Sequence, residues 1–289
     1  MRTRSLLLIA LTAFLALTSA AQKGSGAKSL SRVVEAHLDS KLMGRSMPYR
    51  VMLPDDYAKS TNRYSVIYLL HGFGGNYANW FDKTGLAQYS AGKPFILVTP
   101  EGENGWYTDI PSKPNTNYES YIVKELIPEI DRRYRALNDR AHRMIAGLSM
   151  GGYGALKIAI RNPSMFSLAG SFSGALGVSS DNEALVLSPG ILLTSITTTF
   201  GEPEVHKNND LFAMVASASP EQVKAMPMIY LACGTEDFTF RNNDDFRTLL
   251  LRKKVPHDYR ERPGTHAWAF WDSQVAEFLA VAERSITPK

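Results

Sequence analysis

The sequence predicts an α/β domain in which helices cover both faces of a mostly parallel β-sheet. Two kinds of segment alternate along its 289 residues. Short, unbroken runs of β-branched and aliphatic residues suit strands that are buried on both faces. Between these runs, apolar residues recur at helical spacing. Strands that alternate with helices in this way are typical of a parallel sheet between two helical layers.

Seven runs are expected to form the strands. In chain order they are Tyr49 to Leu53, Tyr64 to Leu70, Pro94 to Thr99, Arg143 to Gly147, Phe166 to Ser171, Met228 to Cys233 and His257 to Glu261. Helical stripes lie over Glu119 to Tyr134, around Phe246 to Leu250 and from Trp271 to Ala282. Pro128 has no N–H group, so it should kink the first of these helices or mark its restart.

The pattern of elements indicates one domain from residue 33 to residue 289, although the length alone would allow two. The stretch from Gly174 to Met226 is the least regular part, and we expect it to be an insertion rather than a second core. Residues 22–32 are rich in Gly, Ser and Lys and should form a flexible lead-in.

Residues 1–21 have the pattern of a secretory signal peptide. Two arginines precede a 12-residue apolar run from Leu6 to Leu17, and small residues follow at positions 19–21. This run is shorter than the roughly 20 residues that a membrane-spanning helix needs. We therefore expect export to the periplasm or the medium, with cleavage after Ala20 or Ala21, and no stable insertion in a membrane.

The overall charge excludes two classes of partner. The formal net charge is +4, from 32 basic and 28 acidic residues. Loss of Arg2 and Arg4 with the signal peptide would leave 30 against 28, or +2. Without a run of five or more basic residues, neither a nucleic acid nor an anionic membrane surface is an expected partner. The single cysteine, Cys233, excludes an intrachain disulfide and lies in an apolar run that indicates a core position.

The segment Gly147 to Gly152 carries the candidate nucleophile, Ser149. It lies between a predicted buried strand and a helix-forming run. A serine on such a sharp turn adopts strained backbone angles, and neighbouring glycines relieve the crowding. The turn lifts the hydroxyl clear of the sheet and directs the helix N-terminus toward it, which favours developing negative charge.

The segment His71 to Gly75 follows the strand that ends at Leu70 and is the candidate source of an oxyanion-binding donor. Acyl transfer requires two N–H groups directed at the forming oxyanion. One is expected from Met150, the residue after the nucleophile, and the other from Phe73, with Gly72 as the alternative. The absence of a Lys-Ser/Thr ending argues against a phosphate-binding loop.

The base and the acid are expected after later strands, in the order serine, acid, histidine. Asp237 follows the strand ending at Cys233, and the adjacent Glu236 is an alternative acid. His266 follows the last strand and is the expected base. The remaining histidines lie before the nucleophile, in the insertion or at the start of a strand, and are less suited: His37, His71, His142, His206 and His257.

One candidate substrate-binding residue is Gly72, in the loop that supplies the oxyanion donor. The others are Trp106, Tyr107 and Trp268, because large aromatic side chains near the motifs can form pocket walls. No cluster of histidines and carboxylates has the spacing of a metal site. The predicted chemistry requires neither a metal nor a cofactor.

Taken together, these motifs resemble the esterase D group of α/β-hydrolases. The resemblance also includes Trp106 to Asp109 and Glu125 to Pro128, and it extends over about Val33 to Glu283. The group contains S-formylglutathione hydrolases, feruloyl and acetylxylan esterases, and mycolyltransferases of the antigen 85 type. The resemblance implies the α/β-hydrolase fold and the same triad and oxyanion donors. The predicted export fits the carbohydrate-associated esterases better than the cytosolic formylglutathione enzymes.

The sequence therefore predicts a serine carboxylic-ester hydrolase that forms an acyl-enzyme on Ser149. The expected substrates are short-chain or aromatic acyl esters of small molecules or oligosaccharides. An acyltransferase with a sugar acceptor would use the same triad, and a thioesterase of the formylglutathione type is a further alternative. A binding protein without catalysis is disfavoured by the intact set Ser149, Asp237 and His266.

Overall fold

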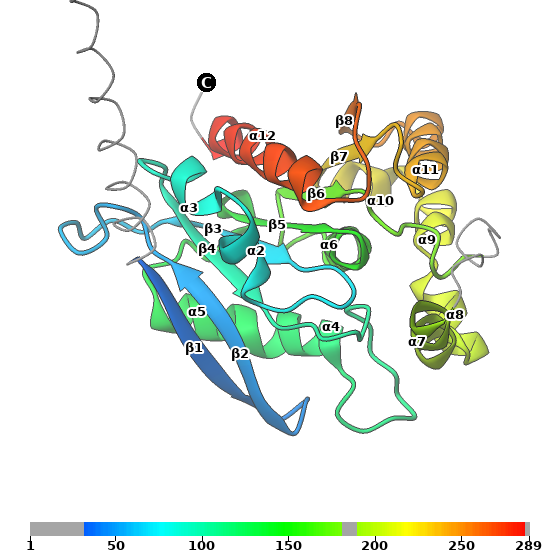
Figure 1. Cartoon of the computed structure of the whole chain (residues 1–289), viewed down its shortest axis with the longest axis horizontal. Coiled ribbons are helices and arrows are strands. Elements are labelled where there is room, and N and C mark those ends of the chain that lie inside the picture. Colours follow the sequence, from blue (N-terminus) through cyan, green and yellow to red (C-terminus); the bar gives the residue numbers. More distant parts are fainter. Residues whose placement is uncertain (1–31, 181–189, 287–289) are drawn as a thin grey trace, which may run out of the picture.

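The computed structural model describes residues 32–180 and 190–286. Within these ranges, eight strands form one sheet in the order β1-β2-β4-β3-β5-β6-β7-β8 (Figure 1). The pairings of β1 with β2 and of β2 with β4 are antiparallel, and all the others are parallel. The prediction of a mostly parallel sheet between helices is confirmed. The predicted signal peptide, and the lead-in apart from Arg32, lie outside the described residues.

The strands are Val33–Ser40 (β1), Arg45–Met52 (β2), Ser65–Leu70 (β3), Phe95–Pro100 (β4), Arg143–Leu148 (β5), Leu168–Phe172 (β6), Met228–Gly234 (β7) and His257–Arg262 (β8). The α-helices are Asn79–Lys83 (α2), Leu86–Tyr89 (α3), Tyr118–Tyr121 (α4), Ile127–Arg133 (α5), Met150–Arg161 (α6), Ile191–Phe200 (α7), Pro203–Asn209 (α8), Leu211–Ser217 (α9), Pro220–Ala225 (α10), Phe240–Lys253 (α11) and Trp268–Ile286 (α12). Ile122–Leu126 (η1) is a π-helical stretch and Arg140–His142 (η2) a 3₁₀ turn.

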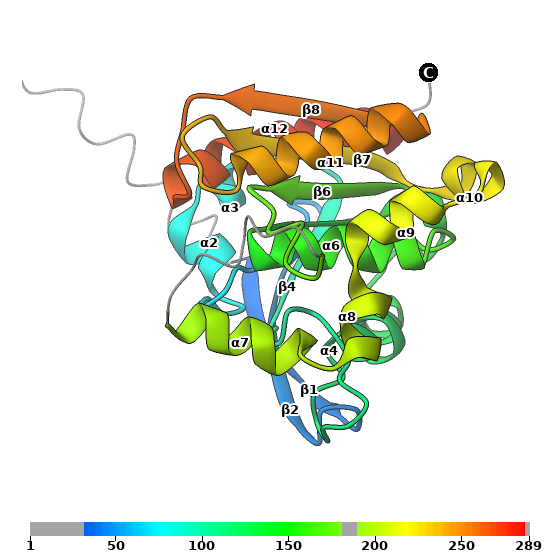
Figure 2. The same cartoon turned by 90° about the vertical axis from the view of Figure 1, so that its right-hand side faces the viewer.

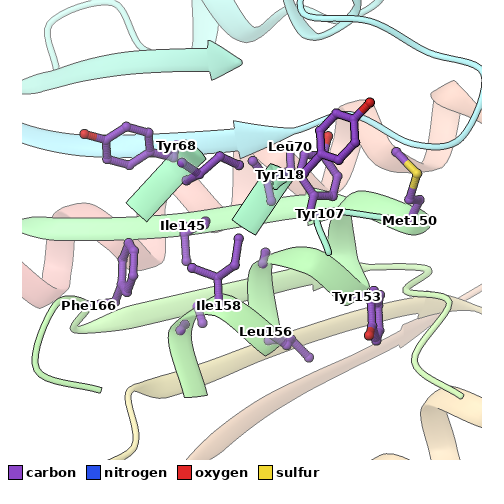
Figure 3. Packing of buried hydrophobic residues seen from close by; sticks show 14 of the residues in the cluster. Tyr68, Leu70, Tyr107, Tyr118, Ile145, Met150, Tyr153, Leu156, Ile158 and Phe166 are labelled. Carbon is purple, nitrogen blue, oxygen red and sulfur yellow. The ribbon is translucent and has the colours of Figure 1, made fainter. Parts of the chain in front are cut away.

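Two apolar clusters lie on the two faces of the sheet. Successive strand residues point to opposite faces, so the buried strand β3 contributes to both clusters. Tyr68 and Leu70 belong to the cluster that includes α5, α6, α9 and α11. Ile67 and Leu69 belong to the cluster that includes α2, α3 and α12. Figure 3 shows Tyr68 and Leu70 together with Ile145 of β5 in the first of these clusters.

Strand β1 has no counterpart among the predicted strands. It pairs with β2 along its whole length, from Val33 opposite Met52 to Ser40 opposite Arg45. The predicted strand Tyr49 to Leu53 is accordingly the second half of a longer strand, β2. Only two residues of β1 are buried, so the strand lacks the continuous apolar run that revealed the central strands.

The helical stripe predicted over Glu119 to Tyr134 is divided into α4, η1 and α5. The Ile127 N–H donates to the Ile122 carbonyl, five residues back, as in a π-helix. Pro128 then lies in the first turn of α5, directly after the π-helical stretch. Leu126 and Ile127 keep right-handed helical angles, so the chain stays helical into α5 and the hydrogen-bond pattern changes to π-helical just before the proline.

The expected insertion from Gly174 to Met226 is more regular than its sequence indicates. Its described part contains α7, α8, α9 and α10, which follow one another along one side of the molecule (Figure 2). Leu211 and Val215 of α9 are buried in the same cluster as α6 and α11. The insertion thus adds to the existing core instead of forming a second one.

Candidate active site

The ends of β5, β7 and β8 lie at one edge of the parallel sheet, and each leads into a turn that carries a predicted site residue. Ser149 follows β5, Asp237 follows β7 and His266 follows β8. Parallel strands deliver their carboxyl ends to the same edge, so residues far apart in the chain become neighbours there.

Ser149 occupies the sharp turn between β5 and α6. Its φ of 52° and ψ of −118° are a conformation that costs a residue other than glycine about 1–3 kcal/mol. The Ser149 N–H donates to the Phe172 carbonyl at 2.9 Å, and its own carbonyl accepts from the Tyr153 N–H at 3.1 Å. A Cβ at Gly151 would lie 2.4 Å from the Leu70 carbonyl oxygen, so glycine is required for this close approach to β3.

The imidazole of His266 bridges the other two residues. Its Nε2 lies 3.0 Å from Ser149 Oγ, and its Nδ1 lies 3.0 Å from both carboxylate oxygens of Asp237. Nδ1 carries the hydrogen, because an ionised carboxylate can only accept. In the neutral ring, Nε2 is then the acceptor for the Ser149 hydroxyl. The geometry is that of a nucleophile, a base and a group that orients the base.

The Asp237 carboxylate is buried and surrounded by donors. Its Oδ1 accepts from the Thr239 N–H at 2.8 Å and from the Thr239 hydroxyl at 2.7 Å, in addition to His266. Burial opposes ionisation, but His266 and the backbone N–H outweigh it, so the pKa of Asp237 is lowered from its ordinary value. The carboxylate is therefore charged at neutral pH beside the imidazole.

Glu236, the alternative acid, lies on the outside of the same loop. It is exposed, and its carboxylate accepts from the Gly264 N–H and from the Thr235 hydroxyl. The Glu236 N–H in turn donates to the Gly264 carbonyl at 3.0 Å. These bonds tie the loop of Asp237 to the loop of His266. Of the two carboxylates, the structure brings Asp237 to the imidazole.

The loop from His71 to Gly75 lies against the nucleophile. A Cβ at Gly72 would be 3.3 Å from Ser149 Cβ. The Gly72 carbonyl accepts from the Gly75 N–H at 3.0 Å and contacts His71 Nδ1 at 2.8 Å. In a trans peptide the N–H is opposite to the carbonyl, so the Phe73 N–H points away from this turn. Neither Phe73 nor Met150 has an acceptor for its N–H among the described residues.

A buried histidine, His71, and a buried carboxylate, Glu101, hold this loop in place by hydrogen bonds. His71 Nε2 lies 3.1 Å from Glu101 Oε1, and the Glu101 carboxylate also accepts from the N–H groups of Tyr77 and Glu103. Burial opposes the ionisation of Glu101, but His71 outweighs it, and the pKa of Glu101 is lowered. His71 is thus a structural residue of the oxyanion loop, as its place in the chain order indicates.

The two predicted pocket-wall residues Trp106 and Tyr107 are buried, which corrects that expectation. Tyr107 lies beneath the loop, and its hydroxyl donates to the His71 carbonyl at 3.0 Å (Figure 3). Trp106 packs against Phe73 with ring centroids 6.2 Å apart. Both residues have positive φ values, 54° and 49°, a backbone turn that the residue types do not reveal. They support the loop instead of facing a substrate.

Two aromatic residues contact His266, and a third packs against one of them. The ring centroid of Phe238 lies 4.4 Å from that of the imidazole, and Trp271 contacts it edge-on at 5.0 Å. Trp268, the third predicted pocket residue, is partly exposed and packs against Trp271 and Trp80. Phe238 was not predicted from the sequence. Its position in the sequence directly after Asp237 could have indicated that it lies beside the triad.

No group of three or more His, Cys, Asp or Glu side chains in residues 32–180 and 190–286 could hold a metal ion. Over the same ranges, every helix is too short or too polar to cross a lipid bilayer.

A serine on a strand–turn–helix elbow, joined to a histidine and an aspartate at the edge of this sheet, defines an α/β-hydrolase. The comparison with family models agrees with this class. Residues 40–281 match the model described as "Putative esterase", and the chain belongs to this esterase family. The resemblance inferred from the sequence motifs is confirmed.

Individual relatives support the same assignment. The chain is 32% identical to an esterase of Mycobacterium tuberculosis over 243 residues, which is 75% of this chain but about half (52%) of that protein's length. It is 27% identical to an acetyl esterase of Caldicellulosiruptor saccharolyticus, over 84% of this chain and 95% of the relative. A solved ferulic acid esterase superposes with a TM-score of 0.76 at 28% identity, over 88% of this chain and 98% of that one.

Proposed function

We propose that this protein is a serine esterase that hydrolyses carboxylic esters through an acyl-enzyme on Ser149. The observation that carries the proposal is the position of the His266 imidazole, within 3.0 Å of both Ser149 Oγ and the Asp237 carboxylate. This arrangement allows a weakly acidic hydroxyl to become a nucleophile, because the proton has an acceptor in place when the oxygen attacks.

In the acylation half, Ser149 Oγ forms a bond to the ester carbonyl carbon while His266 Nε2 takes the hydroxyl proton. Asp237 orients the ring and stabilises its charged form. The carbonyl oxygen becomes an oxyanion, which accepts from the N–H groups of Phe73 and Met150. The bond to the alcohol oxygen then breaks, and His266 returns its proton to that oxygen.

In the deacylation half, water replaces the alcohol. His266 takes a proton from the water as its oxygen attacks the acyl carbon, and the same two N–H groups hold the second oxyanion. The bond to Ser149 Oγ breaks and the proton returns to the serine, which releases the carboxylic acid. The cycle consumes one ester and one water and needs no metal or cofactor.

The proposed substrates are short-chain or aromatic acyl esters linked to carbohydrates. Acetyl esterase and ferulic acid esterase activities are named among the relatives. The longest described helix between residues 174 and 226 has ten residues, so a long apolar lid of the lipase kind is not part of the described chain. We also propose export, from the apolar run in residues 1–21.

A burst experiment tests the mechanism. With p-nitrophenyl acetate, the wild type should release one equivalent of nitrophenol rapidly and the rest slowly, and mass spectrometry should find the acetyl group on the Ser149 peptide. Absence of any covalent acyl-enzyme would refute the proposal. Esters of one alcohol with butyrate and palmitate test the acyl preference, and faster turnover of palmitate would contradict it.

A further inference from the structure

An exposed aromatic ring lies beside the imidazole of His266. Among the described residues, five large apolar side chains are exposed: Val34, Ile191, Met228, Phe238 and Leu251. Phe238 is the only aromatic residue of the five and is 63% exposed. It is also the one in contact with the site, because its ring packs against the imidazole at an interplanar angle of 42°. The rest of the ring remains open to solvent.

The chemistry of the site places the two halves of an ester on different sides. The acyl carbonyl must lie between Ser149 Oγ and the N–H groups of the oxyanion loop. The leaving oxygen must lie within hydrogen-bond distance of His266 Nε2, because that atom supplies its proton. The alcohol therefore extends along the His266 side of the site, where Phe238 is more exposed than Trp268 or Trp271.

We propose that Phe238 is a specificity-determining residue that binds the sugar on the alcohol side of the ester. The inference rests on the proposed function, which already gives a carbohydrate as the alcohol, and adds the residue that binds it. One face of a pyranose ring presents C–H groups that pack on an aromatic ring, while its hydroxyl groups need polar partners. Such partners are at hand, because Thr235 and Thr265 are exposed on the two loops that carry Asp237 and His266.

The leaving group can be isolated by comparing two esters with the same acyl group, ethyl acetate and a mono-acetylated methyl xyloside. Both give the same acetyl-enzyme, so any difference between them arises while the alcohol is still bound. For each variant, the quantity measured is the ratio of kcat/KM for the xyloside ester to kcat/KM for ethyl acetate.

In F238A this ratio should fall about tenfold, the equivalent of about 1.4 kcal/mol for a lost aromatic contact. F238Y keeps the ring and should retain most of the wild-type ratio. L251A is the matched control, because it removes an exposed apolar side chain from α11. Its ratio should equal that of the wild type.

Three outcomes would overturn the assignment. If both esters lose the same factor in F238A, the ring acts only by packing on His266, and a changed pH profile of kcat/KM would accompany that result. If neither ester is affected, the ring binds nothing. If the wild type hydrolyses ethyl acetate but not the sugar ester, the esterase function stands and the sugar is wrong. Failure on all esters would instead reject the proposed function itself.

Discussion

Two buried polar clusters lie toward opposite ends of α6. At the C-terminal half, the Lys157 ammonium contacts Glu119 Oε2 at 3.1 Å, Thr108 Oγ1 at 2.7 Å and Asn209 Oδ1 at 3.0 Å. Its three N–H groups thus have three acceptors. Arg161 is paired with the same carboxylate of Glu119.

At the N-terminal end, the cluster around Ser149 has all its hydrogen-bond partners at Asp237 but lacks some of them at the other residues of the site. Asp237 is fully supplied with donors, but His266 keeps 19% of its side chain exposed. The N–H groups of Phe73 and Met150 have no acceptor in the described chain. A polar cluster whose groups are all paired within the protein stabilises the fold, whereas a cluster with two N–H donors left without an acceptor can bind a substrate oxygen. Substitutions should therefore affect activity at one end and stability at the other.

The largest effect is expected for Ser149→Ala. Loss of the attacking oxygen should lower kcat by up to about a millionfold, as for other serine hydrolases. His266 Nε2 loses its hydrogen bond to Ser149 Oγ, but its side chain is partly exposed and can bond to water instead, so the melting temperature should stay close to that of the wild type. Steady-state rates with p-nitrophenyl acetate and a thermal melt measure the two properties. A variant with a tenth of the wild-type rate would show that the nucleophile is elsewhere.

The next largest effect on kcat distinguishes the two adjacent carboxylates, Asp237 and Glu236. Asp237→Asn should lower kcat about ten-thousandfold, because an amide can donate to Nδ1 and favours the wrong tautomer of His266. Glu236→Gln is the matched control, since its exposed amide oxygen can still accept from the Gly264 N–H. The reverse ranking of the two rates would make Glu236 the acid.

The sequence predicted the parts of the molecule that have a local pattern in the chain, such as a continuous apolar run or a short motif after a strand. Buried parallel strands such as β3 and β5 are continuous apolar runs, which the sequence reveals directly. The triad residues follow the ends of such strands, so their order along the chain was enough to predict them. Ser149, Asp237 and His266 were therefore predicted before any geometry, with Glu236 left open as an alternative acid. Excluding Glu236 required the structure, because both carboxylates follow the same strand by a few residues.

The parts that the sequence did not predict depend on tertiary contacts. Strand β1 is an edge strand with two buried residues, and its pairing with β2 supplies what its pattern lacks. Helix α7 contains isoleucine and threonine residues, whose branched side chains disfavour helices. Its last residue, Phe200, is buried against Trp106 and Tyr153, and this packing decides the conformation.

A smaller effect, on stability alone, is expected for Lys157→Met. Removing one partner of a buried ion pair typically costs about 3–5 kcal/mol, and because Arg161 still faces Glu119 we expect the lower end. The wild-type kcat should be nearly retained. Urea unfolding measures the loss, with Lys124→Met, an exposed lysine on η1, as the control. A full loss of activity with unchanged stability would contradict the division of roles.

The same variant gives a pH dependence of known sign. Burial lowers the pKa of Lys157 from 10.5 to about 8. Between these values the unfolded chain holds a proton that the native protein has released, so native stability rises with pH across this window. The difference in unfolding free energy between wild type and Lys157→Met should therefore be constant below pH 8 and increase up to about pH 10.5. A flat difference would mean that the buried lysine keeps its proton.

The smallest effect is expected at Cys233, which lies four residues from Asp237 but belongs to the core. Its thiol is buried and 3.6 Å from the Thr239 hydroxyl, and burial raises its pKa to about 12. At pH 8 almost no thiolate is present, and only the thiolate reacts with alkylating reagents. N-ethylmaleimide should therefore leave the native enzyme active and modify Cys233 only in urea.

Cys233→Ser should likewise keep kcat close to the wild-type value, because the serine hydroxyl can contact Thr239 in place of the thiol. Rapid inactivation of the native enzyme by the maleimide would show that the end of β7 opens to solvent. The loop that holds Asp237 would then be less rigid than its hydrogen bonds to Thr239 indicate. In that case the contrast between the two ends of α6 would be weaker in solution than the hydrogen bonds indicate, because solvent would reach the acid of the triad.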